Sequence, residues 1–269
     1  MTVAVITVVG MNAPATQELG TANGSSFARF ARFPREPEIT RCPTRCSTCT
    51  LRELCLPCGI TGPDSALFEE IVYTRKRVRR GDALYRTGSD FESLYAVRSG
   101  FFKSSVAIDG GRDQVTGFHM VGEILGTDGI GTDQHAVDAT ALEDSEVCVI
   151  PYARLADPGL QRQLHKVMSR ELVRDQGVIM MLGTMRAEER LAAFLLNLSQ
   201  RFLTRGFSQH DFHLRMTREE IGSYVGLSLE TVSRLFSRFQ EGGLITVQQK
   251  HIQILDIPGL KAVMIRVSE

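Results

Sequence analysis

Hydrophobic and polar positions follow one pattern in the first half of the chain, between about residues 62 and 155. Short apolar runs alternate with polar positions, and glycines separate the runs. Such runs occur at 78–85, 94–100, 115–118 and 147–151. Short alternating runs with turn residues between them predict an antiparallel β-roll or barrel. The sequence Asp109-Gly110-Gly111 predicts a tight hairpin turn within this region.

A helical period begins after Pro158. Positions from 164 to 185 recur at alternating steps of four and three, which is the spacing of a coiled-coil seam. The residues predicted to form a dimer interface are Met168, Glu171, Asp175, Val178 and Leu182. In a parallel homodimer each of the two acids would approach its own copy, so like charges would meet in a partly desolvated contact. Either this repulsion makes the dimer only marginally stable, or the register differs and the acids face solvent.

A helix-turn-helix is predicted in the C-terminal part of the chain. Thr217 and Glu220 have the spacing of a capping box, in which each side chain satisfies a free backbone amide of the other. The helix that they open ends near Gly226. Ser228 is a plausible cap for a second helix, which runs to about Gln240 and is closed by two glycines.

This second helix carries two different faces. A buried stripe is predicted for Val232, Leu235, Phe236 and Phe239. The other face carries Glu230, Ser233 and Arg234 near the N-terminal end, where a recognition helix presents side chains to base edges. Arginine can bond guanine and glutamate can accept from cytosine, so these three residues are candidate DNA contacts. Taken alone, they equally describe a solvated helix with an Arg–Glu pair. The apolar runs that follow, joined by Gln249-Lys250, predict a two-stranded wing and favour double-stranded DNA as the partner.

Composition adds a few limits. The chain has 269 residues, of which 43% are hydrophobic and 23% charged, as in globular proteins. Its formal net charge is zero, so any nucleic-acid role depends on a local basic surface. No apolar run reaches the roughly eighteen residues of a membrane span. Residues 1–40 show no sustained period and are expected to form a mobile tail. The apolar first residues lack a basic start, so we expect a cytoplasmic protein.

The cysteines are strongly clustered. Five of the six lie between Cys42 and Cys58, and the sixth is Cys148. In a cytoplasmic protein, clustered cysteines bind metal more often than they form disulfides. The spacing favours an iron–sulfur cluster, because zinc sites usually show two closely spaced cysteine pairs. A zinc site and a thiol or disulfide switch remain alternatives on spacing alone.

The order β-roll, long helix and winged helix-turn-helix resembles the CRP/FNR family of bacterial transcription factors, and the FNR branch in particular. The stretch 222–235, with its Glu-x-x-Ser-Arg triad, and the stretches 187–199 and 205–208 are similar to that branch. The resemblance implies an α+β fold: an N-terminal antiparallel β-roll of the cyclic-nucleotide-binding, jelly-roll type, a long dimerisation helix and a C-terminal winged helix-turn-helix. The domains expected are a tail 1–40, a cluster loop 41–61, a β-roll sensor domain 62–158, a dimerisation helix 159–185 and a DNA-binding domain 186–269.

The resemblance also implies a cofactor. Proteins of the FNR type hold a [4Fe-4S] cluster, and the cysteines that match their ligands are Cys46, Cys49, Cys55 and Cys148. Cys42 and Cys58 match no ligand position. Leu51, Leu54 and Leu56 are expected to form an apolar shell around the cluster. Arg45 and Arg52 are either charges that offset the cluster or solvated loop residues.

The implied function is oxygen-responsive transcription regulation by a homodimer, mainly activation of anaerobic genes, on a palindrome with TTGAT and ATCAA half-sites four base pairs apart. The loop from Asp109 to Asp113 resembles a surface that contacts RNA polymerase. No cyclic nucleotide is expected, because Gly126-Thr127 and Gln134-His135 stand where the cAMP-binding branch has its phosphate-binding pairs. An iron–sulfur electron carrier or redox enzyme is the alternative from another class. We expect no enzyme, because we find neither a Gly-rich phosphate loop nor a catalytic dyad. A zinc-bound or metal-free thiol switch with the same fold is the other alternative.

Overall fold

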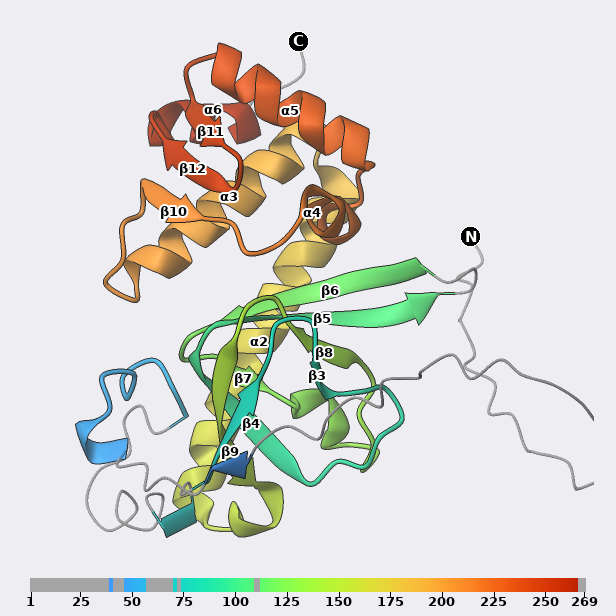
Figure 1. Ribbon diagram of the computed structural model, residues 1–269, viewed down its shortest axis with the longest axis vertical. Coiled ribbons are helices and arrows are strands. Elements are labelled where there is room, and N and C mark those ends of the chain that lie inside the picture. The colour runs from blue at the N-terminus through green and yellow to red at the C-terminus, as the bar shows by residue number, and fades with distance from the viewer. Residues whose placement is uncertain (1–38, 41–45, 57–69, 72–73, 109–111, 266–269) are drawn as a thin grey trace, which may run out of the picture. The chain divides into compact units, whose positions relative to one another are not determined.

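A computed structural model describes residues 39–40, 46–56, 70–71, 74–108 and 112–265 (Figure 1). All of them belong to one compact unit, Glu36–Glu269. Each cysteine and helix position named above is therefore described except Cys42 and Cys58.

Two antiparallel sheets make up the predicted β-roll, which the structure confirms. The first sheet has the order β1-β2-β9-β4-β7 and the second the order β3-β8-β5-β6. The strands are β1 Ile39–Thr40, β2 Thr74–Val78, β3 Ala83–Tyr85, β4 Ser93–Ser99, β5 Phe101–Ile108, β6 Arg112–Met120, β7 Ile124–Leu125, β8 Asp138–Ala141 and β9 Ser145–Pro151. Short 3-10 helices are η1 Cys46–Thr48, η2 Thr127–Gly129 and η3 Tyr152–Arg154. Alternating side chains fill the interior of the roll, where Val97, Phe102 and Val147 are almost completely buried.

Strands β5 and β6 form the longest hairpin of the roll. They pair from Phe101 opposite Met120 to Ile108 opposite Arg112. The turn predicted at Asp109-Gly110-Gly111 itself lies outside the described residues. The hairpin faces the C-terminal domain, because β6 packs against the helix α4, Arg218–Val225.

The helix α2, Pro158–Thr184, begins where the sequence predicts. The Asp157 carboxylate accepts hydrogen bonds from the amides of Gly159 and Leu160, and proline at the first helical position fits the free helix start. Leu160, Leu164 and Met181 are buried on the side that packs on the rest of the chain. The opposite side exposes large apolar side chains: Leu172, Val173, Ile179 and Met180.

The winged helix-turn-helix is also confirmed. Its elements are α3 Ala187–Leu203, β10 Asp211–His213, α4, α5 Leu229–Glu241, β11 Ile245–Gln248, β12 His251–Ile254 and α6 Ile257–Ile265. The three strands form a sheet with the order β10-β12-β11, so the predicted wing has a third strand that the sequence pattern does not reveal. The left-handed Gly226 (φ 66°) ends α4, a conformation that glycine adopts without strain.

The β-roll and the winged helix-turn-helix domain contact one another through the β5–β6 hairpin. Lys103 of β5 forms an ion pair with Glu220 of α4 at 2.9 Å, and both side chains are largely buried. The Ser223 hydroxyl accepts from the Val115 amide at 2.8 Å and donates to the Asp113 carbonyl at 3.1 Å. Aromatic packing continues the contact, because the Phe118 ring meets Tyr224. One hydrophobic core therefore includes residues of both domains.

Membrane insertion is not indicated by any helix in the described ranges, because none is long and apolar enough to span a bilayer.

Candidate cysteine centre and nucleic-acid interface

The cysteine loop is folded by its own backbone hydrogen bonds. The Cys49 amide donates to the Cys46 carbonyl at 3.3 Å, and the Arg52 amide donates to the Cys49 carbonyl at 3.1 Å. A further turn closes between the Cys55 amide and the Leu51 carbonyl at 2.9 Å. Two successive tight turns thus separate the three loop cysteines, as the predicted short helical turn requires.

Cys148 approaches the loop from the middle of the first sheet. It lies on β9, opposite Arg75 of β2 and Ala96 of β4. Cys46 and Cys148 are both buried, and Cys55 packs against the same hydrophobic cluster. Cys55 is close enough to Cys46, Cys49 and Cys148 to interact electrostatically with all three. The fold therefore brings the four predicted cysteines together, although one is remote in sequence.

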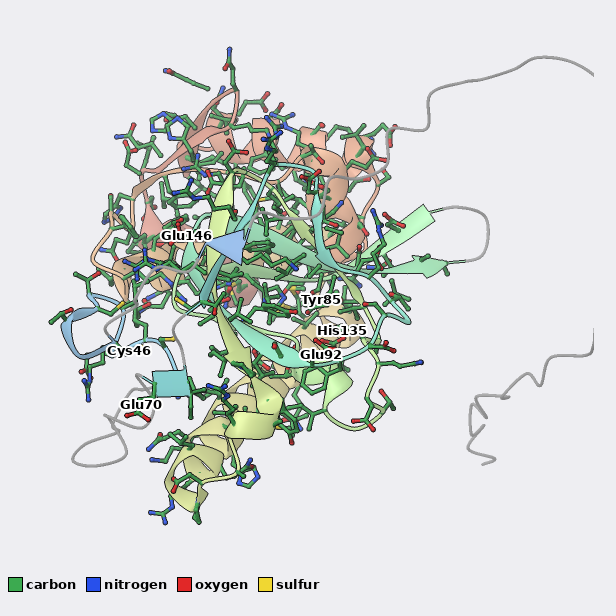
Figure 2. All side chains as sticks on the ribbon, turned by 60° about the horizontal axis from the view of Figure 1, so that its bottom comes forward. Cys46, Glu70, Tyr85, Glu92, His135 and Glu146 are labelled. Atoms are coloured by element: carbon green, nitrogen blue, oxygen red, sulfur yellow. The ribbon has the colours of Figure 1, made fainter. Side chains whose placement is uncertain are left out.

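Arginines surround these thiols. A guanidinium nitrogen of Arg98 lies 3.8 Å from the Cys49 sulfur, and Arg98 also bonds the Cys148 side chain. Glu146 holds Arg98 and Arg75, each at 3.3 Å (Figure 2 labels Cys46 and Glu146). The sequence analysis did not identify Arg98, and no periodic signal marks it. Of the arginines proposed instead, Arg45 lies outside the described residues and Arg52 is half-buried.

The four cysteines are neighbours, but they do not form a closed ligand shell. Within the described ranges, no three Cys, His, Asp or Glu side chains are arranged to hold a metal ion. All four cysteines are free of disulfides. Burial raises the pKa of the Cys148 thiol, while Arg98 and Arg75 oppose that rise. As a set of donors, four thiols with nearby positive charge fit an iron–sulfur cluster, whose iron is held by thiolates.

Leu54 and Leu56 pack differently in this loop. Leu56 is buried in the same cluster as Cys46 and Cys148. Leu54 lies against Gly122 of the turn between β6 and β7. Gly122 has φ +86°, and an added Cβ would lie 2.8 Å from the Leu54 Cβ. Only glycine allows the loop to approach this turn so closely.

His135 belongs to Gln134-His135, one of the two stretches expected to stand where the cAMP-binding branch has phosphate-binding pairs. Its side chain is buried in the β-roll. Its ring stacks on Tyr85 at 3.6 Å between centroids (both residues are labelled in Figure 2). It also lies beside Gly126. A cavity of about 560 Å³ adjoins this region and reaches α2. Arginines do line it, namely Arg174 and Arg201, but they come from α2 and α3 and bind Glu123.

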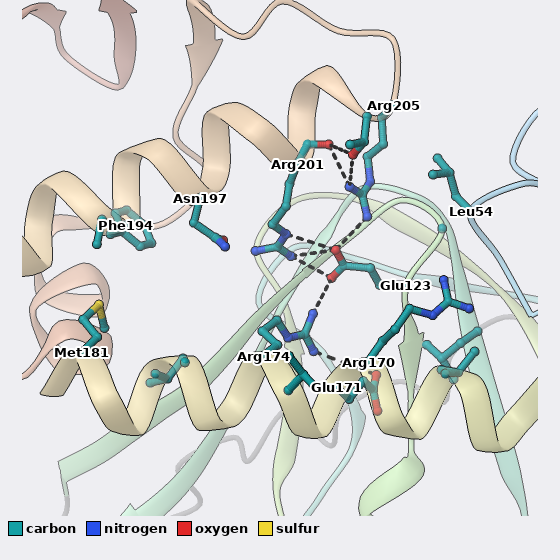
Figure 3. A pocket seen from close by; sticks show the side chains of 18 of the residues that line it. Leu54, Glu123, Arg170, Glu171, Arg174, Met181, Phe194, Asn197, Arg201 and Arg205 are labelled. Atoms are coloured by element: carbon teal, nitrogen blue, oxygen red, sulfur yellow. Dashed lines mark hydrogen bonds and ion pairs between the residues drawn. The ribbon is translucent and has the colours of Figure 1, made fainter. Parts of the chain in front are cut away.

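The turn between β6 and β7 carries the most densely bonded acid in the described chain. Glu123 accepts from Arg201 at 2.7 Å, Arg205 at 2.7 Å and Arg174 at 3.3 Å (Figure 3). Burial disfavours its ionised form, but the three positive charges outweigh burial and hold its pKa at about 2. No sequence pattern predicts that Glu123 and these three arginines lie together, apart from the i, i+4 spacing of Arg201 and Arg205.

The second helix of the helix-turn-helix, α5, presents the predicted reading residues. Glu230 and Arg234 are exposed and Ser233 is half-buried. The opposite stripe of Val232, Leu235, Phe236 and Phe239 is buried, as predicted. Ser228 caps the helix by accepting from the Thr231 amide at 3.2 Å. The reading face is thus presented by a helix whose start and orientation are fixed.

The first helix, α4, begins with the predicted capping box. The Glu220 amide donates to the Thr217 hydroxyl at 3.1 Å, and the Thr217 amide donates to the Glu220 carboxylate at 2.7 Å. Hydrogen bonds to Lys103 and Thr217 favour the charged form and, against burial, lower the pKa of Glu220. The cap and the contact to the β-roll therefore share one carboxylate.

The predicted dimer residues do not all lie on one free face of α2. Val178 and Leu182 pack against the core shared by the two domains, and Met168 packs against the cysteine-side core. Glu171 accepts from the Thr127 hydroxyl at 2.8 Å, so it faces the β-roll of its own chain. Asp175 is exposed. The dimer seam stays a prediction, with most of its predicted residues engaged within the chain.

Comparisons with known proteins agree with this architecture. A model of the cyclic nucleotide-binding domain matches residues 75–157, and a model of the Crp-like helix-turn-helix domain matches residues 189–263. The transcriptional regulatory protein btr of Bordetella pertussis is 46% identical over 86% of this chain and 96% of its own length. The transcriptional activator protein FnrA of Stutzerimonas stutzeri is 45% identical over 81% of this chain and 91% of its own length. The structure of FixK2 from Bradyrhizobium japonicum superposes with a TM-score of 0.66 at 26% identity, covering 72% of this chain and 98% of that one.

A β-roll, a long helix and a winged helix-turn-helix, matched over nearly the full length of these relatives, define a DNA-binding transcription regulator rather than an enzyme. The chain belongs to the CRP/FNR family, and its relatives place it with the FNR-type regulators.

Proposed function

We propose that this protein is an oxygen-responsive transcription regulator, mainly an activator of anaerobic genes. In this proposal Cys46, Cys49, Cys55 and Cys148 hold a [4Fe-4S] cluster. The observation that carries it is the convergence of three loop thiols on Cys148, together with the half-buried Arg98 beside them. When bound, such a cluster supplies a link between the loop and the β-roll that oxygen can destroy.

The protein's own residues provide the rest of the site. Arg98 and Arg75 place positive charge beside the thiols, which favours their thiolate form. Leu56 covers the inner side of the loop and excludes water from it. Glu146 keeps both arginines in position through its ion pairs. These contacts give the site a charge balance and a solvent barrier that a surface thiol switch would not need.

The output is binding to a palindromic duplex by a homodimer. Glu230, Ser233 and Arg234 would read a half-site of the TTGAT-N4-ATCAA type from the major groove. Two recognition helices must then lie about 34 Å apart, one turn of DNA. We propose that the second copy packs on the exposed apolar side of α2, where Leu172 and Ile179 flank the exposed Asp175. An acid between apolar side chains would make that dimer marginal.

A surface for RNA polymerase belongs to the same proposal. It includes the loop from Asp109 to Asp113, whose first three residues lie outside the described ranges. The described strands β5 and β6 that flank this segment are paired up to Ile108 and Arg112.

Purification without oxygen tests the proposal directly. The protein should be brown, contain iron and acid-labile sulfide, sediment as a dimer and bind the palindromic duplex. Exposure to air should remove the colour, the dimer and most of the DNA affinity. Cys148→Ser should lose iron and sulfide even without oxygen, because the loop then has no ligand on the β-roll.

Cys42→Ser is the matched control, since this cysteine matches no ligand position, and it should keep the iron content of the unaltered protein. A colourless protein with stoichiometric zinc, or one without metal that still binds the duplex, would contradict the cluster and support a thiol switch. Unchanged iron in Cys148→Ser would remove Cys148 from the ligand set.

A further inference from the structure

The turn between β6 and β7 is a point where three parts of the chain meet. Its carboxylate, Glu123, binds Arg174 of α2, Arg201 of α3 and Arg205 of the turn that follows α3 (Figure 3). Two of these arginines also bind backbone carbonyls of β6 and of the β6–β7 turn. Arg201 donates to the Phe118 carbonyl and Arg205 to the Val121 carbonyl, each at 2.6 Å. The end of α3 and the turn that follows it are therefore held to this part of the β-roll through both a side chain and the backbone.

The ion pairs between Glu123 and its three arginines are largely buried and depend on charge. The Glu123 side chain is 14% exposed and that of Arg205 is 8% exposed. Three guanidinium groups around one carboxylate leave an excess of positive charge, so the arginines would repel one another if the carboxylate were lost. Bidentate bonding from Arg201 through two nitrogens fixes the orientation as well as the distance.

The cysteine loop touches the same turn. Leu54, which immediately precedes Cys55, packs on Gly122, which immediately precedes Glu123. Figure 3 shows Leu54 on the side of Glu123 where Arg205 lies, at the edge of a cavity of about 650 Å³. A change in the loop at Cys55 thus acts directly on the residue next to the carboxylate.

A second route joins the cysteines to the turn through β4. The Gly122 amide donates to the Val97 carbonyl at 2.8 Å, and the Val97 amide donates to the Glu123 carbonyl at 2.9 Å. Val97 lies between Ala96, which pairs with Cys148, and Arg98, which approaches Cys49. The turn is therefore bonded to the strand that contacts both the loop cysteines and the β-roll cysteine.

We infer that Glu123 is a positioning residue that couples the cysteine centre to the dimer helix and the DNA-binding domain. The inference rests on the proposed function for its input signal, the state of the cysteine loop. Leu54 and Gly122 receive that signal, and Glu123 distributes it to Arg174 on α2, to Arg201 on α3 and to Arg205 in the turn that follows α3. Both outputs of the regulator, dimerisation and the placement of the reading helix, then depend on one carboxylate.

The test compares iron content with DNA affinity in the same preparations. For each variant, the dissociation constant for the palindromic duplex is measured without oxygen and again after exposure to air. The ratio of the second to the first measures the coupling. Leu54→Ala should retain iron and sulfide without oxygen, but its ratio should fall at least fivefold, because the contact that transmits the signal is lost.

Thr50→Ala is the control. Thr50 is an exposed residue of the same loop, and it is not among the nearest neighbours of Gly122. Its iron content and its ratio should equal those of the unaltered protein. A ratio that is unchanged in Leu54→Ala, or one that falls equally in Thr50→Ala, would overturn the inference.

Variants of the carboxylate test the distribution step. Glu123→Gln should keep its iron and lose at least tenfold in DNA affinity without oxygen, whereas Glu123→Asp should recover most of that loss because it keeps the charge. Full affinity in Glu123→Gln would also overturn the inference. If Glu123→Gln fails to fold, Leu54→Ala and its control decide the question alone.

The two proposals can fail separately. Unaltered protein that contains iron and loses DNA affinity in air, while Leu54→Ala behaves identically, would refute the coupling and leave the proposed function intact. Unaltered protein without iron, whose affinity for the duplex does not respond to air, would refute both.

Discussion

The cysteine centre and the recognition helix are assembled in different ways. The reading face on α5 depends on residues close in sequence: Ser228 caps the helix, and the buried stripe that ends at Phe239 orients it. The cysteine centre depends on a strand far along the chain, because Cys148 lies on β9 in the first sheet. The proposed reading residues thus share one helix, whereas the thiols come from a loop and from a distant strand.

This difference indicates that the two regions have different roles. Under the proposed function, a reading face that is already formed on α5 would be regulated through its position. The contacts that position it come from the β-roll, through Glu123 and through the β5–β6 hairpin. A centre built from two parts of the chain that are distant in sequence is suited to changing those contacts.

The largest effect that separates the two regions is expected for Phe236→Ala. Phe236 is almost fully buried beneath the reading face, and truncation of such a ring costs about 3–5 kcal/mol. Urea unfolding should show this loss, and binding to the palindromic duplex should fall with it. Leu229→Ala on the same helix is the control, because Leu229 is 46% exposed and should change stability by less than about 0.5 kcal/mol. If Phe236→Ala also loses its iron without oxygen, the two regions are not independently folded.

A smaller effect, on discrimination alone, is expected for Arg234→Ala. Losing one bidentate base contact should cost about 1–3 kcal/mol of preference for the matching base pair. Competition binding with duplexes altered at single positions measures it. Arg238→Ala lies one turn further along α5 and bonds Glu188, so it should leave the base preference unchanged. An equal loss in both variants would mean that Arg234 contributes charge and no base reading.

The smallest effect concerns pH and Glu171. Burial raises its pKa to about 7, although the Thr127 hydroxyl and Arg174 oppose that rise, while Glu123 and Asp175 add to it. An unfolded chain releases this proton near pH 4.5, so stability from Glu171 falls as pH rises from about 4.5 to 7 and stays low above 7.

Glu171→Gln removes this dependence. Relative to the unaltered metal-free protein, the variant should gain ~2 kcal/mol between pH 5 and pH 8 in urea unfolding. The measured quantity is the difference in free energy of unfolding between the variant and the unaltered protein. Groups that titrate alike in both proteins therefore do not contribute to it. A difference that stays constant with pH would show that burial does not raise the pKa of Glu171.

Local sequence patterns were enough to predict much of the fold. The capping box at Thr217, the cap at Ser228 and the stripe on α5 all depend on spacings of a few residues, and each is present in the structure. The pairing of β10 with the wing was not predictable, because it joins strands that are far apart in sequence. The same reason explains why Arg98 was missed: it approaches Cys49 of the loop and pairs with Glu146 of β9, and both residues are far from it in sequence.

The helix α2 shows what periodicity alone leaves open. Its steps of four and three describe a stripe, but they do not say whether the stripe meets a second copy or the same chain. Glu171 and Val178 lie on that stripe and contact their own chain, while Leu172 and Ile179 on another face are exposed. The cluster around Glu123 was equally hidden, because its three arginines come from α2, from α3 and from the turn after α3, without a shared period.

The contacts between α4 and the β5–β6 hairpin limit how freely such regulators can exchange parts. Glu220 serves both its own helix cap and Lys103 of the roll, and Ser223 bonds the backbone on both sides of Gln114. A chimaera that joins this roll to the DNA-binding domain of a relative must therefore retain Glu220 and Ser223, or replace both sides together. Two side chains of α4 therefore tie the choice of β-roll to the choice of helix-turn-helix.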